Sequence, residues 1–325
     1  MRVAVVHSDV GADAAPDDLD TLVTADAVAA ALRALGHDPT LVPFRLALDD
    51  LGRALKASRA DVVFNLVETV FGEDSLAAMA PTVFEALSMP YTGSAAAPIA
   101  LAADKPLSKR VLHAAGLPTP PWSEGPRWQG LEEDRLYIVK SATEDASLGL
   151  DDGALVRGRG AAIARALQSA ERHGGRWFAE GYVEGREFNV AILETESGLG
   201  ALPIPEMRFE DWPEAKPRIV GYRAKWHEGS EDARKTVRAF GLERGEPYLA
   251  RTLADLALQA ARLFGTRGYT RVDFRMDRDG RPFILEINPN PCLAPDAGFA
   301  AAAKEAGFTY QALIGSILSA AAAAR

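Results

Sequence analysis

Two carboxylates, Asp273 and Glu286, lie in otherwise apolar, strand-like runs of the stretch RVDFRMDRDGRPFILEINPN, residues 271–290. An isolated carboxylate is costly in such a setting. The Asp-Gly pair at 279–280, between two alternating runs, is the strongest short-range signal of a β-hairpin. With this pair at the centre of a two-residue turn, Asp273 faces Glu286 across the hairpin.

The predicted register divides the hairpin into an apolar and a polar face. On the apolar face, which we expect to be part of a core, the pairs are Met276 with Phe283, Phe274 with Leu285, and Val272 with Ile287. The polar face pairs Asp273 with Glu286 and Arg271 with Asn288.

The polar face has the side chains of a metal site. Like charges directly opposite each other destabilise a sheet, so the gathering of Asp273, Glu286 and Asn288 favours a hard cation. Mg²⁺ prefers oxygen ligands and leaves coordination positions for substrate phosphates. We predict that these residues bind one or two Mg²⁺ ions, with Mn²⁺ as an alternative. A solvated outer face with ordinary charges is the competing interpretation, which the pairing of like charges weakens.

The first part of the chain must position these groups against a substrate. Residues 1–97 alternate strand-like runs such as DVVFNLV with helical runs such as TLVTADAVAAALRALG, and YTGS is expected as a fourth short strand. This order predicts a parallel sheet with helices on its faces. Ligands bind at the carboxyl ends of such strands, so the loops after Asp9 and Val67 are the first expected binding loops.

Two further units follow, which we place at residues 98–183 and 184–325. The predicted class is α/β, with α+β character in the C-terminal half. A long polar segment at 206–247 is expected to be functional or mobile, because such connections are uncommon in compact domains.

Composition limits the class of protein. The chain has 325 residues, 48% hydrophobic and 25% charged, which suits two or three packed units of a soluble enzyme. The net charge of −9 argues against a nucleic-acid partner. With Cys292 as the one cysteine, no internal disulfide is possible, and a reducing, cytoplasmic setting is expected. No membrane association is expected, because no run approaches the length of a spanning helix.

Several motifs in order resemble the ATP-grasp enzymes, and among them the D-alanine–D-alanine ligases. They are FGEDSLAAMAPTVFEALSMPYTGS, ADKPLSKRVLHAAGLPTPPW, YIVKSATEDASLG, FAEGYVEGREFNVAIL, FILEINPNP and AAKEAGFTYQALI. The resemblance implies a Rossmann-like N-terminal domain (1–97) and central (98–183) and C-terminal (184–325) ATP-grasp subdomains, with ATP between the last two. It implies that ATP phosphorylates a carboxylate and that an amine attacks the acyl phosphate to form an amide.

The resemblance also assigns residues to the ATP phosphates. Lys105 would reach the phosphates, and Lys140 would contact phosphate or adenine, since a lysine in apolar YIVK is costly to bury unpaired. Ser147 and backbone amides of the loop EDASLG would cover the phosphates. Lys225 would contact the terminal phosphate when its loop closes and excludes water.

Further implied contacts concern the nucleoside and the reacting centre. Glu180 would accept from the adenine amino group, the backbone at Val183 would meet the ring edge, and Glu187 would bind the ribose hydroxyls. Arg271 would act in catalysis, because a planar, always-charged donor suits the charge that develops in the reaction. A salt bridge from Arg271 to Asp273 or Glu286 is the alternative role, and both roles can coexist.

Departures from the family pattern cluster at the amino-acid sites. HSDVGADAAPDDLDT (7–21) lacks the expected glycine-rich turn with a glutamate. Residues that replace family side chains are Glu68 for a histidine, Ala146 for a serine, Trp226 for a tyrosine, Cys292 for a glycine and Ala297 for a serine. The ATP and metal residues are retained while the substrate pocket has changed, so specificity for D-alanine does not follow.

Glu68, Glu73 and Cys292 are the residues we assign to the substrate site. We hypothesise that Glu68 and an N-terminal aspartate bind a substrate ammonium or a second basic group, and that Cys292 is structural, contributing its backbone amide. The expected partners are amino-acid-like small molecules, and a homodimer is implied by the resemblance. A ligase for a larger peptide or biosynthetic intermediate, and a non-catalytic nucleotide-binding module, are the alternative functions.

Overall fold

The first unit is the parallel sheet that the alternation of strands and helices predicts. The structure, a computed structural model, describes residues 1–11, 16–45, 47–144, 147, 149–214, 216–227 and 229–323. The strands pair in the order β2-β1-β3 and are β1 (Arg2–Ser8), β2 (Asp38–Phe44) and β3 (Val62–Leu66). The predicted fourth strand was wrong in extent, because only a single parallel bridge joins Val63 to Tyr91.

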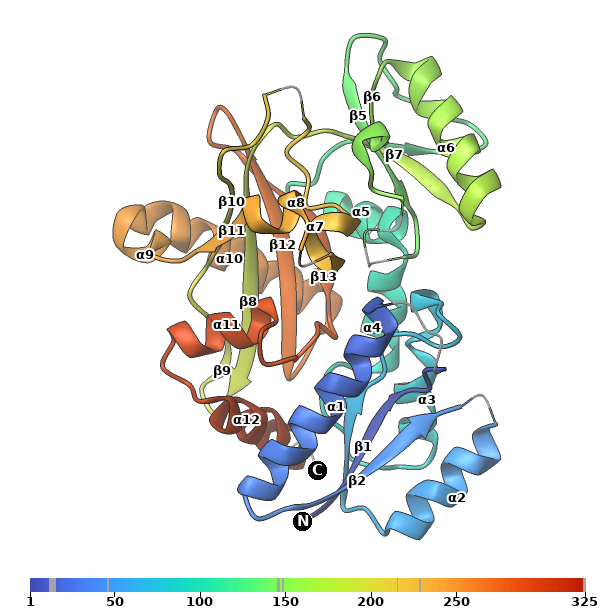
Figure 1. Cartoon of the computed structure of the whole chain (residues 1–325), viewed down its shortest axis with the longest axis vertical. Helices are drawn as coiled ribbons and strands as arrows, with labels where there is room; N and C mark the ends of the chain where they lie inside the picture. The colour runs from blue at the N-terminus through green and yellow to red at the C-terminus, as the bar shows by residue number, and fades with distance from the viewer. Residues whose placement is uncertain are drawn as a thin grey trace.

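Both ends of the chain build the base of the molecule. Helices α1 (Pro16–Ala34), α2 (Leu48–Ser58) and α3 (Met79–Ala86) accompany the N-terminal sheet. The last helices, α11 (Gly298–Glu305) and α12 (Tyr310–Ala323), return to it, and α12 packs beside α1 (Figure 1). One hydrophobic core joins Val5 and Phe64 of the first unit to Leu313 and Ile317 of α12. The end of the chain therefore helps to hold the N-terminal sheet.

The central unit is a small antiparallel sheet with one covering helix. Its strands are β4 (Trp122–Glu124), β5 (Leu136–Ser141), β6 (Leu155–Arg157) and β7 (Trp177–Gly181), in the order β4-β7-β5-β6. Helix α6 (Arg159–His173) lies against this sheet, and Tyr137, Ala162 and Trp177 form the core between them. Figure 1 shows this unit as a separate lobe at the top of the molecule.

The third unit is a larger antiparallel sheet. Its strands are β8 (Gly185–Thr195), β9 (Gly198–Ala201), β10 (Glu206–Phe209), β11 (Thr236–Ala239), β12 (Tyr269–Asp277) and β13 (Pro282–Asn288). They follow the order β11-β10-β8-β12-β13, with β9 beside β8. Helix α10 (Pro247–Phe264), preceded by the short α9 (Leu242–Gly245), covers one face. The mixed classes predicted for the two halves are confirmed.

Two helices connect the first unit to the second. Helix α4 (Ala96–Ala103) is followed directly by α5 (Lys105–Ala114). The Asp104 side chain caps α5 by accepting from Leu107 N at 2.9 Å, and Pro106 occupies the first turn, where its missing N–H costs nothing. The start of α5 is therefore well defined, and so is the position of Lys105.

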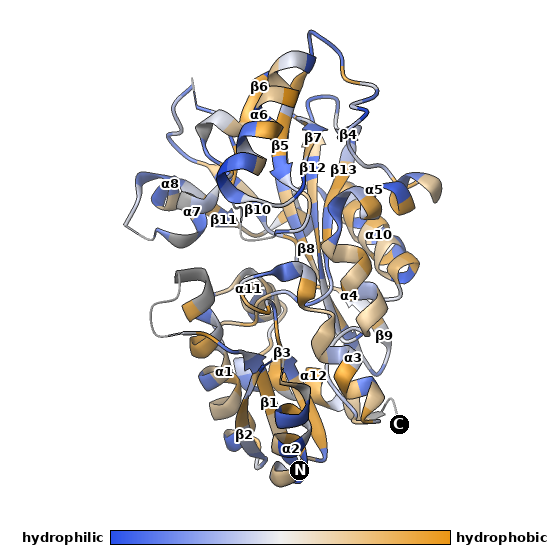
Figure 2. Ribbon diagram, turned by 90° about the vertical axis from the view of Figure 1, so that its right-hand side faces the viewer, coloured by the Kyte–Doolittle hydropathy of each residue, from blue (hydrophilic) through white to orange (hydrophobic). Residues whose placement is uncertain are grey.

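The long polar segment at 206–247 has regular structure. Strands β10 and β11 pair with each other and extend the third sheet, and α7 (Tyr222–Trp226) and α8 (Glu231–Lys235) lie between them. In Figure 2 the strands β1 and β3 are coloured as hydrophobic, while α8 is mainly hydrophilic. Within the described ranges, no helix has both the length and the hydropathy needed to cross a membrane.

The hairpin β12–β13 confirms the predicted pairing at its far end. Arg271 pairs with Asn288 and Asp273 with Glu286. Nearer the turn the prediction was wrong, because Phe274 pairs with Ile284 and Met276 with Pro282, one residue out of the expected register.

Two irregularities cause this shift and cancel each other. At the turn, Asp277 N donates to Arg281 O and Gly280 N to Asp277 O, so the loop has one residue more than predicted, with Gly280 at φ +79°. A β-bulge next to Asp273 leaves Leu285 without a cross-strand partner and restores the register. Leu285 therefore leaves the predicted core face and lines the cavity described below.

Candidate functional site

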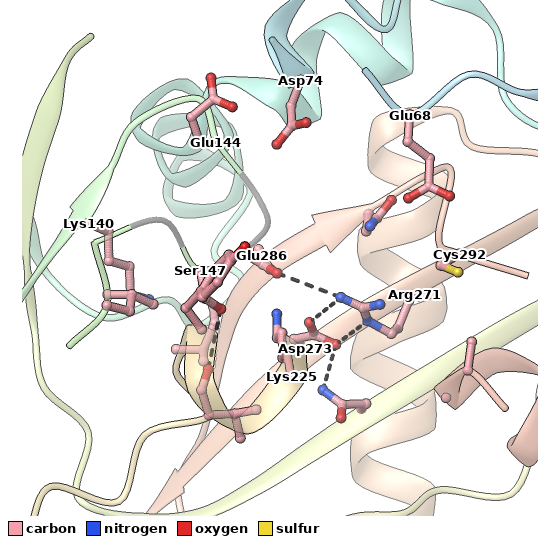
Figure 3. A pocket seen from close by; sticks show the side chains of 18 of the residues that line it. Glu68, Asp74, Lys140, Glu144, Ser147, Lys225, Arg271, Asp273, Glu286 and Cys292 are labelled. Carbon is pink, nitrogen blue, oxygen red and sulfur yellow. Dashed lines mark hydrogen bonds and ion pairs between the residues drawn. The ribbon is translucent and has the colours of Figure 1, made fainter. Parts of the chain in front are cut away.

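A cavity of about 1190 Å³ lies where the three units meet. Its walls come from helix α1, the loop after β3, helix α4, the start of α5, strands β5, β7, β8, β12 and β13, and helix α7. Of the two expected binding loops, the one after Val67 lines the cavity, whereas the described residues of the loop after Asp9 do not. Figure 3 shows charged side chains from these separate elements pointing into the same space. Such a concave site with convergent polar groups is the expected form of a small-molecule site.

The floor of the cavity is the polar face of two neighbouring strands. In the antiparallel pair β8–β12, Glu187 lies opposite Arg275 and Asn189 opposite Asp273. The alternate residues Phe188, Val190, Val272 and Phe274 are buried in the core on the other face. The period of two along each strand therefore directs one set of residues into the core and the other into the cavity.

Arg271, Asp273 and Glu286 form a charged cluster on this floor (Figure 3). Arg271 donates to both oxygens of Asp273, from Nε at 2.8 Å and from Nη2 at 2.9 Å. Asn189 Nδ2 also donates to Asp273 Oδ1 at 2.7 Å, and Arg271 Nη2 lies 3.8 Å from Glu286 Oε1. The predicted salt bridge of Arg271 is confirmed.

The two carboxylates have pKa values shifted in opposite directions. Burial raises the pKa of Asp273, and the negative charge of Glu286 adds to this rise against the opposing effect of Arg271. Burial also disfavours the ionised form of Glu286, but the positive charges of Lys105, Lys225 and Arg271 outweigh it and lower the pKa of Glu286 to about 2.

The donor set of this cluster fits Mg²⁺ in part. Asp273, Glu286 and Asn288 present two carboxylates and an amide oxygen on one face, and Asn288 Oδ1 also accepts from Asn290 N at 2.9 Å. Among the residues that the structure describes, no three or more His, Cys, Asp or Glu side chains form a metal-binding group. A bound ion would therefore need the Asn288 oxygen together with ligand or water oxygens, as Mg²⁺ commonly does.

The wall formed by the central unit carries a buried ion-pair cluster. Lys140 Nζ donates to Glu180 Oε1 at 2.7 Å, and Lys109 forms an ion pair with the other oxygen of Glu180. Burial opposes ionisation of Glu180, but the two lysines lower its pKa. Lys109 was missed in the sequence, although it lies four residues after Lys105 in α5 and so one helical turn away.

Lys105 and Ser147 lie at the loop that is predicted to cover the phosphates. Lys105 is buried and its Nζ donates to Glu144 O at 2.9 Å. Ser147, at φ +64°, donates from Oγ to Val220 O at 3.3 Å. Half of the predicted loop EDASLG, including Ala146, lies outside the described residues, so its backbone donors stay a prediction.

The remaining residues predicted at the nucleotide also line the cavity. Burial raises the pKa of Glu187, against the effect of Arg275 Nη1 at 3.6 Å. Val183 is half-buried between β7 and β8, and Lys225 points from α7 towards Asp273 (Figure 3). The side chain of Trp226 lies outside the described part of the chain.

At the opposite end, Cys292 lies among acidic residues. Its Sγ donates to Asp20 Oδ2 at 3.2 Å, and both Asp20 and Glu68 line the cavity. Burial raises the pKa of Cys292, and the negative charges of Glu68 and Asp20 raise it further. Glu73 is exposed and does not line the cavity, whereas its neighbour Asp74 does. The structure thus brings Glu68 and Cys292 together and leaves Glu73 apart.

Arg238 of β11 also faces this end and was missed in the sequence. Its Nη1 donates to Asp296 O at 3.4 Å, next to Ala297, the N-cap of α11. Across the described ranges, no carboxylate lies within ion-pair distance of Arg238. No local pattern predicted that Arg238 would line the cavity. It lies on β11, in the polar segment at 206–247, for which no secondary structure was predicted.

Comparison with known proteins identifies the family. The family model described as D-ala D-ala ligase C-terminus matches residues 127–319. A D-alanine–D-alanine ligase from Anaeromyxobacter sp. (strain Fw109-5) is 34% identical over 311 residues, which cover 93% of this chain and 92% of the relative. This chain belongs to the D-alanine–D-alanine ligase family.

Other relatives of this ligase-family chain cover nearly all of it. A D-alanine–D-alanine ligase from Methylococcus capsulatus is 32% identical over 98% of the chain and 94% of the relative. An uncharacterized protein, y4sG, from Sinorhizobium fredii is 32% identical over 90% of the chain and 86% of the relative. The structure matches D-alanine–D-alanine ligase from Bacillus anthracis, complexed with ATP, with a TM-score of 0.74 and 21% identity, covering 100% and 98% of the two chains. The predicted ATP-grasp fold is confirmed.

Proposed function

We propose that this chain is an ATP-dependent carboxylate–amine ligase that joins two amino acids or amino-acid-like molecules. The observation that carries the proposal is the cross-strand pair of Asp273 and Glu286 in the floor of a cavity that also receives Arg271, Lys105 and Lys225. A module that only bound a nucleotide would have no need of paired carboxylates next to an arginine at the reacting end.

The reaction has two steps. An oxygen of the substrate carboxylate attacks the terminal phosphorus of ATP, the bond to ADP breaks, and an acyl phosphate forms. The nitrogen of the second substrate then attacks the acyl carbon and loses a proton, and phosphate leaves as the amide forms. Both steps move negative charge, so the chain must supply fixed positive charge near the reacting atoms.

Residues of this chain supply that charge. Lys105 and Lys140 bind the phosphates with Ser147, and Lys225 approaches the terminal phosphate from α7. Arg271, held in its orientation by two hydrogen bonds to Asp273, stabilises the charge on the acyl phosphate and the tetrahedral intermediate. Glu180, Glu187 and the backbone at Val183 bind the adenosine.

Mg²⁺ is part of the proposal. Asp273, Glu286 and Asn288 would hold one or two ions, with Mn²⁺ as an alternative, which would neutralise phosphate oxygens during transfer. The cross-strand pairing of Asp273 with Glu286 supports this assignment, because two facing carboxylates favour a cation between them.

The acidic end of the cavity supports a substrate with a positive charge. Asp20 accepts a hydrogen bond from the Cys292 thiol, and Glu68 is close enough for its charge to act on that thiol. We infer that the two carboxylates bind the ammonium or a second basic group of an amino-acid substrate. The partners are thus small molecules, with no nucleic acid or membrane. A cytoplasmic location and a homodimer remain part of the proposal.

Phosphate release with Mg²⁺ and ATP tests the function against D- and L-amino acids, singly and in pairs. Release with a pair, together with a new amide in the mass spectrum, is the expected result. Release only with peptides would favour a larger acceptor. Tight ATP binding without turnover for any acceptor would contradict the proposal and favour a non-catalytic module.

A further inference from the structure

The cavity depends on a lysine that does not reach it. Lys109 is 1% exposed and does not line the cavity, yet it forms an ion pair with Glu180, which does. Its Nζ also donates to Thr119 Oγ1 at 3.0 Å and to Leu285 O at 3.3 Å. A buried lysine is stable only where such partners offset its desolvation. The three partners of Lys109 therefore fix the position of its ammonium group.

The three partners of Lys109 belong to different parts of the molecule. Glu180 is on β7 of the central unit, Thr119 is in the segment after α5, and Leu285 is on β13 of the third unit. Leu285 is the bulge residue, whose carbonyl is released from pairing with β12 by the shift in register. The bulge thus provides an acceptor at the place that Lys109 can reach from α5.

Glu180 and Leu285 lie on the two walls of the nucleotide end of the cavity. Both line it, from the central and the C-terminal unit respectively. The segment before β4 continues this connection, because Ile284 N donates to Pro118 O at 2.8 Å and Thr119 Oγ1 donates to Ile284 O at 2.9 Å. Lys109 is therefore the charged centre of a contact that sets how far the two walls stand apart.

We propose that Lys109 is a positioning residue for the nucleotide. It holds the Glu180 carboxylate against Lys140 and ties it to the bulge carbonyl of Leu285, and so determines affinity for ATP and the preference for adenine over other bases. The proposal rests on the proposed function in one respect, namely that Glu180 accepts from the adenine amino group. Lys109 acts through Glu180 and has no contact with the reacting atoms.

The test measures binding and turnover separately. Lys109→Met is compared with Lys109→Arg, with Glu180→Gln, and with the double variant Lys109→Met/Glu180→Gln. Arg110→Met serves as the control, because Arg110 follows Lys109 on α5 and is exposed, where its ion pair with Glu124 contributes little. Calorimetry gives Kd for ATP and GTP with Mg²⁺, and phosphate release gives KM and kcat.

We expect Lys109→Met to raise Kd and KM for ATP about tenfold, in the range of coupling between contacting residues. The ATP-to-GTP preference should fall in parallel, with kcat nearly unchanged, because uniform binding is lost and not transition-state stabilisation. Lys109→Arg should restore part of the affinity. The double variant should match Glu180→Gln alone, because Lys109 acts on the adenine through the position of the Glu180 carboxylate.

An unchanged Kd for ATP and an unchanged base preference in Lys109→Met would overturn the inference. It would also be overturned if the fold-change in Kd of the double variant equalled the product of the fold-changes of the two single variants. If Lys109→Met does not fold, the double variant, which removes both buried charges, is used in its place. Its Kd for ATP is compared with that of Glu180→Gln, and equal values support the inference while a weaker affinity of the double variant overturns it. A wild-type chain that binds ATP but forms no amide would contradict the proposed function and leave this inference standing.

Discussion

The two ends of the cavity differ in how their charges are arranged. At the nucleotide end several charges have an opposite partner: Lys109 and Lys140 bind Glu180, and Arg271 binds Asp273. At the substrate end, Glu68 and Asp20 gather around a neutral thiol, and Arg238 has no carboxylate within ion-pair distance among the described residues.

The difference shows which end is organised before ligands bind. Side chains that are already held in ion pairs keep their positions and lose little conformational freedom when a nucleotide binds. At the other end the negative charges of Glu68 and Asp20 act on the Cys292 thiol, and a ligand of opposite sign would be attracted to them. The proposed nucleotide end thus has charges held by partners, and we propose that the substrate end selects its ligand by charge. The variants below test this contrast, from the largest expected effect to the smallest.

Asp273→Asn should have the largest effect. We expect ligation to fall about a thousandfold or more, because metal-assisted charge stabilisation is worth several kcal/mol. Stability should be unchanged or higher, since the raised pKa of Asp273 indicates that its ionised form is disfavoured in the fold. Phosphate release and thermal melting, with and without Mg²⁺, measure both effects. Asp255→Asn, on the exposed face of α10, is the control; near-normal ligation by Asp273→Asn would refute the metal assignment.

Glu68→Gln should weaken binding of an amino-acid substrate by about 10- to 100-fold, the usual value of a hydrogen bond to a charged group. The KM for ATP should stay the same, because Glu68 lies at the other end of the cavity. Glu73→Gln provides a matched comparison, and we expect no effect there because Glu73 is exposed and outside the cavity. Amino-acid KM values that do not change in Glu68→Gln would count against the ammonium site.

Arg238→Met should raise the KM of the substrate that carries a free carboxylate at this end about tenfold, with Arg238→Lys intermediate. The effect is expected to be smaller than that of Glu68→Gln because Arg238 is more exposed. Arg208→Met is the control, since Arg208 lies on the adjoining strand and pairs with Glu206. Equal responses in the two variants would indicate a general charge effect and no specific contact.

Cys292→Ala should have the smallest effect, within about twofold on kcat, because a backbone donor survives a change of side chain. The raised pKa of Cys292 has a second consequence. A thiol with a raised pKa stays neutral above its ordinary range, so alkylation by iodoacetamide should remain slow at pH 8 and increase only at higher pH. Rapid alkylation at neutral pH, or loss of turnover in Cys292→Ala, would assign the thiol a chemical role.

The paired carboxylates of the hairpin could be predicted from the sequence, because they follow local rules, whereas the nucleotide residues were assigned only through the resemblance to the family. The Asp-Gly turn and the alternation along β12 and β13 placed Asp273 opposite Glu286. The same reasoning misplaced Leu285, because an additional turn residue shifts the register by one between the turn and the bulge. The bulge restores the register, so the pairing of Asp273 with Glu286 was still correct. The helical spacing of Lys109 from Lys105 was the one local signal for it, and its partners could not be predicted because they are 10, 71 and 176 residues away along the chain.

By itself the sequence determined the hairpin, its paired carboxylates, the order of strands and helices, and the motifs that identify the family. Period-two alternation and turn chemistry act between near neighbours, so they can be read along the chain. Only the tertiary structure decided that Lys109 holds Glu180 and that Asp20, Glu68 and Cys292 meet in one cavity. These contacts join segments of separate units, and their distances depend on how the units pack against one another.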